Sequence, residues 1–323
     1  MTSRSIILSH SGKQHSYYVA KALLDLGYLK QFVTSSYVSS PLLQKLIQVS
    51  KLTYLTRRFH QGLNAPYVDA NWRYELKEQV MRMLKGNTPA VNNLVIDRDV
   101  SFDRALSKRL RRLNFETFWG FQGSCLRCLQ TANQMNKETV CEMTSVYLPT
   151  AKAILQEEAR LNPEWADSIV FSSFPSAYEA RLVEEPQIAK HVIAISQFLK
   201  TTLIEGGIDE KRISVVPLGF DASAIKFNST TLSLRDRPLR LLFVGRITQG
   251  KGIKYLLEAM KEFDKRDVEL HIIGNIYGSG EALSSYKKQY TYSPGVSQQT
   301  LFSLYGNYDV LVLPSILEGF GLV

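Results

Sequence analysis

The feature that most constrains the fold is the alternation of short apolar runs with helical patterns in the last third of the chain. Residues 239–244, 268–273 and 308–313 are apolar runs that each end at a glycine or a proline. After the first run, apolar residues recur from Ile253 to Phe263 at the spacing of one helix face. Strands that alternate with helices predict a parallel, doubly wound sheet, which binds ligands beyond the carboxyl ends of its strands.

The first two thirds of the chain repeat this pattern less regularly. Residues 5–9 predict a short strand, and a helix with Tyr17 and Leu24 on one face follows the loop HSGKQHS. A polar stretch predicts a linker at residues 221–237, between a first domain at residues 1–220 and a second at residues 238–323. Further strands are predicted at residues 139–141, 168–171, 191–195 and 213–216.

Composition excludes several classes of protein. A chain of 323 residues is long enough for about two domains, and its 45% hydrophobic and 21% charged residues are typical of globular proteins. No apolar run in the sequence approaches the roughly 20 residues of a membrane-spanning helix. The apolar segment at the start is too short for a signal peptide, and three cysteines do not indicate a disulfide framework. We therefore expect a cytoplasmic protein.

Positive charge is concentrated near the start of the chain. The net charge is +9, but the first 113 residues contain 18 Lys and Arg against 7 Asp and Glu, a net charge of +11. Such a surface attracts acidic lipid headgroups, nucleic acid or phosphorylated substrates. No aromatic and basic RNA-binding motif accompanies the charge, so nucleic acid is not an expected partner.

Two short motifs are candidates for chemistry. In VGRITQGKG, Gly245 allows a tight turn at a strand end, Arg246 can hold a diphosphate with two hydrogen bonds, and Lys251 adds a compact charge where the next helix begins. In EGFGL, Glu318 can accept hydrogen bonds from hydroxyls beside two permissive glycines. The alternative is that these are ordinary charged loop residues, because the first motif lacks the Walker spacing.

The order of these motifs resembles a known family. VGRITQGKG, IIGNIYGSG, PGVSQQTLFSLYGNYDVLVLPS and the final EGFG resemble the nucleotide-sugar-binding half of the retaining glycosyltransferases of the GT-B fold, group 1 or family 4 type. The likeness is strong from about Arg240 to the end and weaker from Gly123 to Asp221. It implies two Rossmann-like doubly wound domains that face a cleft, with the C-terminal domain incomplete here.

The resemblance also implies roles for individual residues. Arg246 and Lys251 would contact the diphosphate of the donor, and Glu318 would contact hydroxyls of the donor sugar. The other donor-binding positions that it implies are Gly12, Gly245, Gly274, Gly295, Val296, Phe320, Gly321 and Leu322.

Some positions depart from the family pattern. The family has a second glutamate eight positions after the first, which binds the ribose; that position would be 326, beyond Val323, so we expect a shortened version of a longer protein. Ser11 replaces the first glycine of the pair that relatives carry at Gly12. Tyr147 stands near the place where relatives often have a histidine close to the donor sugar, so Tyr147 is a possible substrate contact.

The implied reaction is hexosyl transfer from a UDP or GDP sugar to a glycan or lipid-linked acceptor, as in polysaccharide and glycolipid biosynthesis. The resemblance implies front-face attack, in which the leaving phosphate helps to remove the acceptor proton, so no nucleophile, metal or further cofactor is assigned. Two alternatives stay open. A nucleotide-sugar 2-epimerase shares this architecture, and a chain without the second glutamate could be a non-catalytic donor-binding scaffold.

Three other features have two interpretations each. Residues 41–59 and 104–112 combine apolar and basic residues. This pattern fits either ordinary helices or segments that contact the anionic inner face of the cell membrane.

His10 and His15 flank Gly12, and His15 is a possible substrate contact, although loop histidines are often structural. Cys125 and Cys128 form a CxxC without a second pair, so we interpret them as helix residues and not as a zinc or redox site.

Overall fold

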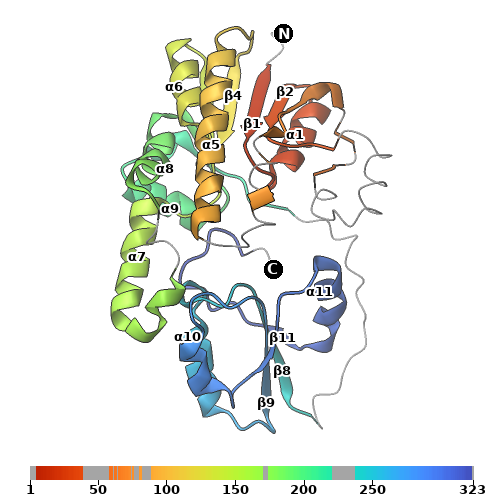
Figure 1. Cartoon of the computed structure of the whole chain (residues 1–323), viewed down its shortest axis with the longest axis vertical. Coiled ribbons are helices and arrows are strands. Elements are labelled where there is room, and N and C mark those ends of the chain that lie inside the picture. Colours follow the sequence, from red (N-terminus) through yellow and green to blue (C-terminus); the bar gives the residue numbers. More distant parts are fainter. Residues whose placement is uncertain are drawn as a thin grey trace. The chain divides into compact units, whose positions relative to one another are not determined.

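The computed structural model of the chain describes residues 5–38, 58–60, 62–63, 65–73, 75, 80–81, 89–169, 174–219 and 237–321. The chain divides into two compact units, and Figure 1 labels many of their elements. Unit 1 comprises Met1–Thr144 and Pro175–Val216, and unit 2 comprises Ser145–Phe174 and Pro217–Val323. The chain therefore leaves unit 1 after its fifth described strand, returns to it, and leaves it again.

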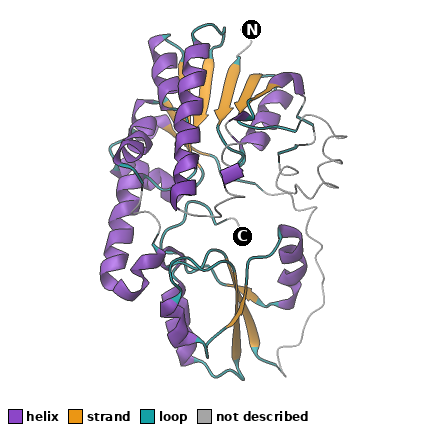
Figure 2. Cartoon of the chain, viewed as in Figure 1, coloured by secondary structure: helices purple, strands orange, loops and turns teal. Residues whose placement is uncertain are grey.

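Unit 1 is a parallel sheet with helices between its strands (Figure 2). The seven described strands are all parallel and follow the order β3-β2-β1-β4-β5-β6-β7. The elements are β1 (Ile6–His10), α1 (Ser16–Asp25), β2 (Leu29–Thr34), η1 (Ala65–Tyr67), β3 (Val68–Ala70), α5 (Pro89–Leu110), β4 (Thr117–Phe121), α6 (Leu126–Gln134), β5 (Glu138–Met143), α8 (Ser176–Ile188), β6 (His191–Ala194), α9 (Gln197–Glu205), η4 (Glu210–Arg212) and β7 (Ile213–Val215).

The core of unit 1 explains why its first segments form a strand and a helix. The run IILSH is almost wholly buried, as expected for a strand of a parallel sheet that is covered on both faces. Tyr17, Ala20 and Leu23 lie on one face of α1 and pack with Phe32 and Phe121. The strand order reverses between β1 and β4, and this switch point is where doubly wound sheets bind ligands.

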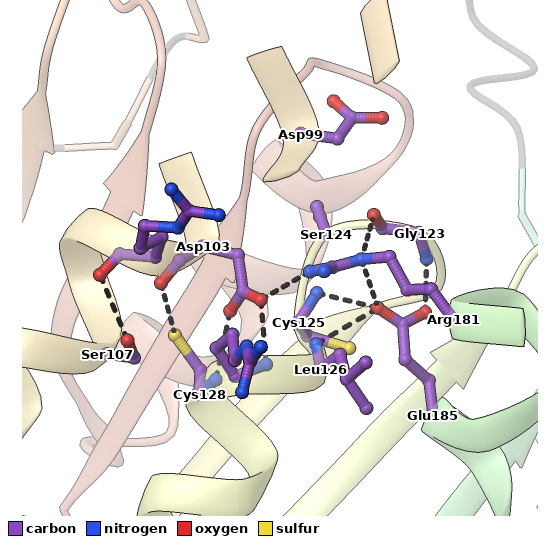
Figure 3. Close-up of polar contacts among 12 residues, drawn as sticks. Asp99, Asp103, Ser107, Gly123, Ser124, Cys125, Leu126, Cys128, Arg181 and Glu185 are labelled. Atoms are coloured by element: carbon purple, nitrogen blue, oxygen red, sulfur yellow. Dashed lines mark hydrogen bonds and ion pairs between the residues drawn. The ribbon is translucent and has the colours of Figure 1, made fainter. Parts of the chain in front are cut away.

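Two buried carboxylates hold the start of α6 in unit 1 (Figure 3). Glu185 accepts hydrogen bonds from the amides of Gly123, Cys125 and Leu126, and both bonds to its Oε1 measure 3.0 Å. Asp103 accepts from the next two amides, at 2.7 and 2.9 Å. Arg181 forms ion pairs with both carboxylates. Every amide of the first turn of α6 therefore has a partner within the protein.

Burial shifts the pKa values of the ionisable groups at the start of α6. Burial raises the pKa of Glu185 to about 7, although the neighbouring Arg181 guanidinium lowers it in part. Burial also raises the pKa of the Cys125 and Cys128 thiols well above their ordinary value. Both thiols are free and buried, with Cys128 inside α6 and Cys125 directly before it.

Unit 2 has a smaller parallel sheet whose described strands follow the order β10-β9-β8-β11. Its core includes Phe243, Leu257, Ile272 and Trp165. As in unit 1, the strand order reverses beside the first strand of the sheet, here between β8 and β11. The elements are α7 (Leu148–Leu161), η2 (Pro163–Ser168), β8 (Leu239–Val244), η6 (Gln249–Lys251), α10 (Ile253–Ala259), η7 (Met260–Glu262), β9 (Val268–Ile273), η8 (Glu281–Tyr286), β10 (Thr291–Ser293), α11 (Gln298–Leu304), η9 (Tyr305–Asn307) and β11 (Val310–Leu311).

The segment with α7 and η2 packs in unit 2, whereas the sequence places it within the first domain. Gln249 joins it to the loop after β8, because its side chain donates to Glu158 at 2.8 Å and its amide donates to Ser168 Oγ at 2.9 Å. Tyr255 OH also donates to Glu158, at 3.1 Å. The predicted strand at residues 168–171 is wrong at its start, because Ser168 ends the 3-10 helix η2.

Some sequence predictions fall on residues outside the described ranges. These are most of the linker at residues 221–237, residues 41–57 of the predicted amphipathic helix, and the last two residues of the 168–171 strand. The basic cluster at residues 104–112 is described and lies on the end of α5 and the turn after it. None of the helices in the described part of the chain is long and apolar enough to cross a membrane.

Candidate functional site

Backbone hydrogen bonds join the loop that follows β8 to the loop that follows β9. Ile247 donates its amide to the carbonyl of Asn275 at 2.9 Å, and Tyr277 donates its amide to the carbonyl of Ile247 at 3.1 Å. A Cβ atom at Gly274 would lie 1.7 Å from the carbonyl oxygen of Gly245, so only glycine fits at this crossing. The two glycines that the sequence marks as strand ends therefore touch each other.

The loop that follows β8 is also hydrogen-bonded to the segment that follows β11. The carbonyl of Gly250 accepts from the amides of Ile316 and Leu317, at 3.1 and 3.2 Å. Gly252 has φ +68°, and a Cβ atom there would lie 2.0 Å from the carbonyl oxygen of Pro314. The two segments with the predicted donor residues thus meet at the β8/β11 switch point.

This meeting brings Lys251 and Glu318 together as an ion pair. Their side chains remain 25% and 34% exposed, and Ser315 Oγ donates to Glu318 at 3.3 Å. Arg246 is exposed and lies over the ring of Tyr277, 5.5 Å from its centroid, and is not paired with Glu318. An accessible ammonium beside a carboxylate can bind a ligand that carries both an anionic group and hydroxyl groups.

The other predicted donor-binding residues of unit 2 surround these loops in part. The amide of Gly295 donates to Asn275 Oδ1 at 3.2 Å, and Val296 beside it is exposed. Phe320 is half-buried and Gly321 is exposed. Leu322 lies outside the described residues.

The predicted residues Gly12 and His15 lie in unit 1, after β1. The amide of Gly12 donates to His10 Nδ1 at 2.6 Å, and Ser11 Oγ donates to the buried Asp99 at 2.5 Å. His15 Nε2 pairs with Glu142, a carboxylate that is almost wholly buried. Tyr147 belongs to unit 2, where it precedes α7 and is buried.

Burial dominates the titration of the polar groups beneath this loop. It lowers the pKa of His10 to about 3, so the ring is neutral near pH 7. It raises the pKa of Asp99, against the lowering by the Arg98 guanidinium and the hydrogen bond from Ser11.

Sequence reasoning missed Glu142, Trp119 and Asp99. Trp119 Nε1 donates to Glu142 at 2.9 Å, so this carboxylate holds two side chains. A glutamate inside the buried part of strand β5 was the available signal, because a buried charge needs partners. The described residues contain no group of three or more His, Cys, Asp or Glu that could hold a metal ion.

The fold class is confirmed by comparison with known structures. Over 97% of its length, this chain superposes on 74% of Alr3699/HepE from Anabaena, solved in complex with UDP, with a TM-score of 0.52 and 12% sequence identity. Two Rossmann-like α/β units with this likeness define the GT-B fold.

The sequence of the C-terminal part matches a known family. Residues 225–323 match the family model described as Glycosyl transferases group 1.

Two curated relatives illustrate the likeness. An uncharacterized glycosyltransferase of Methanocaldococcus jannaschii is 35% identical over 104 residues, which cover 29% of this chain and 25% of the relative. The lipopolysaccharide 1,2-N-acetylglucosaminetransferase of Salmonella typhimurium is 26% identical over 205 residues, which cover 58% of this chain and 52% of the relative. The matches thus span about half of these relatives or less.

Proposed function

We propose that the protein is a glycosyltransferase that moves a sugar from a nucleotide-diphosphate sugar to a glycan or lipid-linked acceptor. The observation that carries this proposal is the pairing of Lys251 with Glu318 at the β8/β11 switch point, inside the residues that match the family. The relative from Salmonella typhimurium is named for transfer to lipopolysaccharide, which supports a glycan or glycolipid acceptor.

In this proposal each side chain has one task. Lys251 and Arg246 stabilise the negative charge that develops on the departing diphosphate, and no metal ion is required for that step. Glu318 accepts hydrogen bonds from hydroxyls of the donor sugar and orients its anomeric carbon. The acceptor hydroxyl attacks the face that the diphosphate leaves, the phosphate helps to take its proton, and the configuration at the anomeric carbon is retained.

Calorimetric titration with UDP and with GDP tests the donor site. We expect one of the two to bind and Lys251→Met to weaken that binding about 10- to 100-fold, because a hydrogen bond to a charged group contributes about 1.5–3 kcal/mol. The substitution Lys261→Met is the matched control, since Lys261 is an exposed lysine of the same unit that pairs with Glu258. Binding of neither nucleotide would refute the assignment.

Product analysis tests the reaction class and its stereochemistry. With the nucleotide sugar of the base that binds, we expect a glycosylated product only when an acceptor is added, with the same anomeric configuration as the donor by NMR. A changed nucleotide sugar formed without acceptor would instead indicate an epimerase. A product of opposite configuration would refute the proposal of retention.

The proposal extends to peripheral contact with an anionic membrane at the inner face of the cell membrane. Arg104, Lys108 and Arg109 are exposed near the end of α5, and Arg112 is exposed in the turn after it. We expect the protein to float with vesicles that contain phosphatidylglycerol and not with phosphatidylcholine alone. Because each basic residue near such a surface contributes about 1 kcal/mol, Arg104→Glu with Lys108→Glu should lower binding at least about tenfold. Equal binding to both vesicles would contradict this contact.

A further inference from the structure

Gln249 lies in the turn between Arg246 and Lys251, the two residues assigned to the donor diphosphate. It is wholly buried in unit 2, whereas Arg246 is exposed and the side chain of Lys251 is partly exposed. Glutamine is mostly found at protein surfaces, and a buried amide side chain needs partners for its polar atoms. The partners of Gln249 come from three different segments of unit 2.

The side-chain oxygen of Gln249 caps the helix that follows the turn. The N-cap residue of α10 is Gly252, which has no side chain that could accept from the amides of the first helical turn. The carbonyl oxygen of Pro314 excludes a side chain at Gly252. Gln249 Oε1 accepts instead from the amide of Lys254, in the first turn of α10, at 3.1 Å. Gln249 thus supplies the cap that the glycine cannot.

This bond fixes the orientation of the Gln249 amide group. A backbone N–H can only donate, so the atom that faces the Lys254 amide is the oxygen. The nitrogen, Nε2, then faces α7 and donates to Glu158 Oε1 at 2.8 Å. Asn162 donates to the same oxygen of Glu158, and Tyr255 OH donates to the other oxygen. Three side chains therefore hold this buried carboxylate in place.

The backbone of the turn is held as well. The amide of Gln249 donates to Ser168 Oγ at 2.9 Å, and Ser168 is buried at the end of η2. The carbonyl of Gln249 accepts from the amide of Gly252 at 2.8 Å. The amide of Lys251 donates to the carbonyl of Thr248 at 3.0 Å. The main chain of Lys251 is therefore tied through Gln249 to buried partners in α7, η2 and α10.

We propose that Gln249 is a positioning residue that holds Lys251 at the site of the donor diphosphate. Lysine carries a compact charge on a flexible side chain, so the place of its ammonium depends on where the main chain holds it. Misplacement of a functional group by about 1 Å can lower a reaction rate about 100-fold. Gln249 itself does not contact the ligand, because it is buried among residues of α7, η2 and α10. The inference rests on the proposed function for the identity of the ligand.

The first test separates the diphosphate from the rest of the nucleotide. Calorimetry compares the nucleoside diphosphate that binds, UDP or GDP, with its monophosphate. Gln249→Met removes both side-chain hydrogen bonds and replaces glutamine by a residue of similar size. We expect the affinity for the diphosphate to fall about 3- to 10-fold and that for the monophosphate to change by less than about twofold, because Lys251 is assigned to the diphosphate. Equal losses for both nucleotides would overturn the proposal.

A double-mutant cycle tests whether Gln249 acts through Lys251. Once Lys251→Met has removed the ammonium, a residue whose role is to hold that ammonium has nothing left to position. We therefore expect Gln249→Met to cause no further loss of diphosphate affinity in the Lys251→Met background. Fully additive losses would overturn the proposal, because they would show that the two residues act independently.

A variant on another segment keeps the proposal testable if Gln249→Met does not fold. Ser168→Ala removes only the side-chain acceptor of the Gln249 amide, and we expect it to lower diphosphate affinity about 2- to 3-fold. No effect of Ser168→Ala would contradict the proposal.

Gln289→Met is the matched control. Gln289 precedes the amino end of β10, whereas Gln249 follows the carboxyl end of β8. The buried Oε1 of Gln289 has no hydrogen-bond partner within the described residues. We expect Gln289→Met to leave both affinities unchanged. A loss of diphosphate affinity equal to that of Gln249→Met would overturn the proposal.

Hydrogen exchange distinguishes failure of this proposal from failure of the proposed function. The amides of Lys251 and Gly252 are hydrogen-bonded inside the turn, so their exchange reports its order without any nucleotide. In Gln249→Met we expect faster exchange at both amides and unchanged exchange at Ile272 in β9, the internal control. If the wild-type protein binds neither UDP nor GDP but these amides respond, the proposed function fails and Gln249 still positions Lys251. Unchanged exchange at Lys251 and Gly252 would overturn the positioning role.

Discussion

Replacing Gly252 by alanine tests whether the close contact between the two donor segments holds the site together. The new Cβ would lie 2.0 Å from the carbonyl oxygen of Pro314, which is far inside van der Waals contact. The φ of +68° adds strain of about 1 kcal/mol for a residue with a side chain. Since overpacking of this kind adds about 1–3 kcal/mol, we expect a loss of about 2–4 kcal/mol in the free energy of unfolding.

Gly207→Ala is the matched control for the backbone term. Gly207 has φ +86°, but no atom lies within 4 Å of the place where its Cβ would stand. We therefore expect Gly207→Ala to lower the free energy of unfolding by only about 1 kcal/mol. The difference between the two variants in urea titrations isolates the steric effect of the Pro314 contact.

A local measurement tells whether the site itself opens. The amides of Ile316 and Leu317 donate to the carbonyl of Gly250, so hydrogen exchange at these two amides reports the contact between the segments. In Gly252→Ala we expect faster exchange there and lower turnover, because Glu318 follows the displaced segment. If exchange at these amides and unfolding both match those of Gly207→Ala, the contact does not hold the site together.

Three further predictions concern single side chains. Glu318→Gln should leave UDP or GDP binding unchanged or tighter in calorimetry, because it releases Lys251, while turnover of the nucleotide sugar falls; weaker nucleotide binding would contradict this. Acidification from pH 6.5 to 5 should lower the free energy of unfolding by about 2 kcal/mol through His10, whose pKa is about 3 in the folded protein, because only the unfolded chain takes up the proton. His10→Gln should reduce this slope in urea titrations, and an unchanged slope would show that other groups cause it. Arg181→Met should lower the free energy of unfolding by about 3–5 kcal/mol, since it leaves two buried carboxylates without their cation. A free energy of unfolding within about 1 kcal/mol of the wild-type value, measured by thermal unfolding, would contradict that reasoning.

The sequence predicted the fold class because strand and helix signals are local. The largely apolar runs that became β8 and β9 have the predicted bounds, since each is followed directly by a glycine. The strand predicted at residues 308–313 is shorter in the structure, where only Val310–Leu311 pair with β8. Pairing depends on a neighbour that the local pattern does not describe.

The candidate site was predicted where its residues lie in motifs and missed where they meet through the fold. Lys251 and Glu318 were both named from sequence, but their ion pair depends on the turn at Gly252 and could not be read from spacing. Glu142 was missed because its partners come from β4 and the loop after β1. The segment with α7 was placed in the first domain because sequence order alone does not show which core a helix packs on.

The placement of α7 has a consequence for synthesis on the ribosome. Glu158 leaves the peptidyl transferase centre 91 residues before Gln249, the residue that donates to it in the finished fold. At a synthesis rate of about 5–20 residues per second, that gap lasts about 5–20 s. During this interval the apolar face of α7 has no core to cover it, so nascent chains of this protein should be most vulnerable to aggregation, and most dependent on chaperones, before β8 emerges.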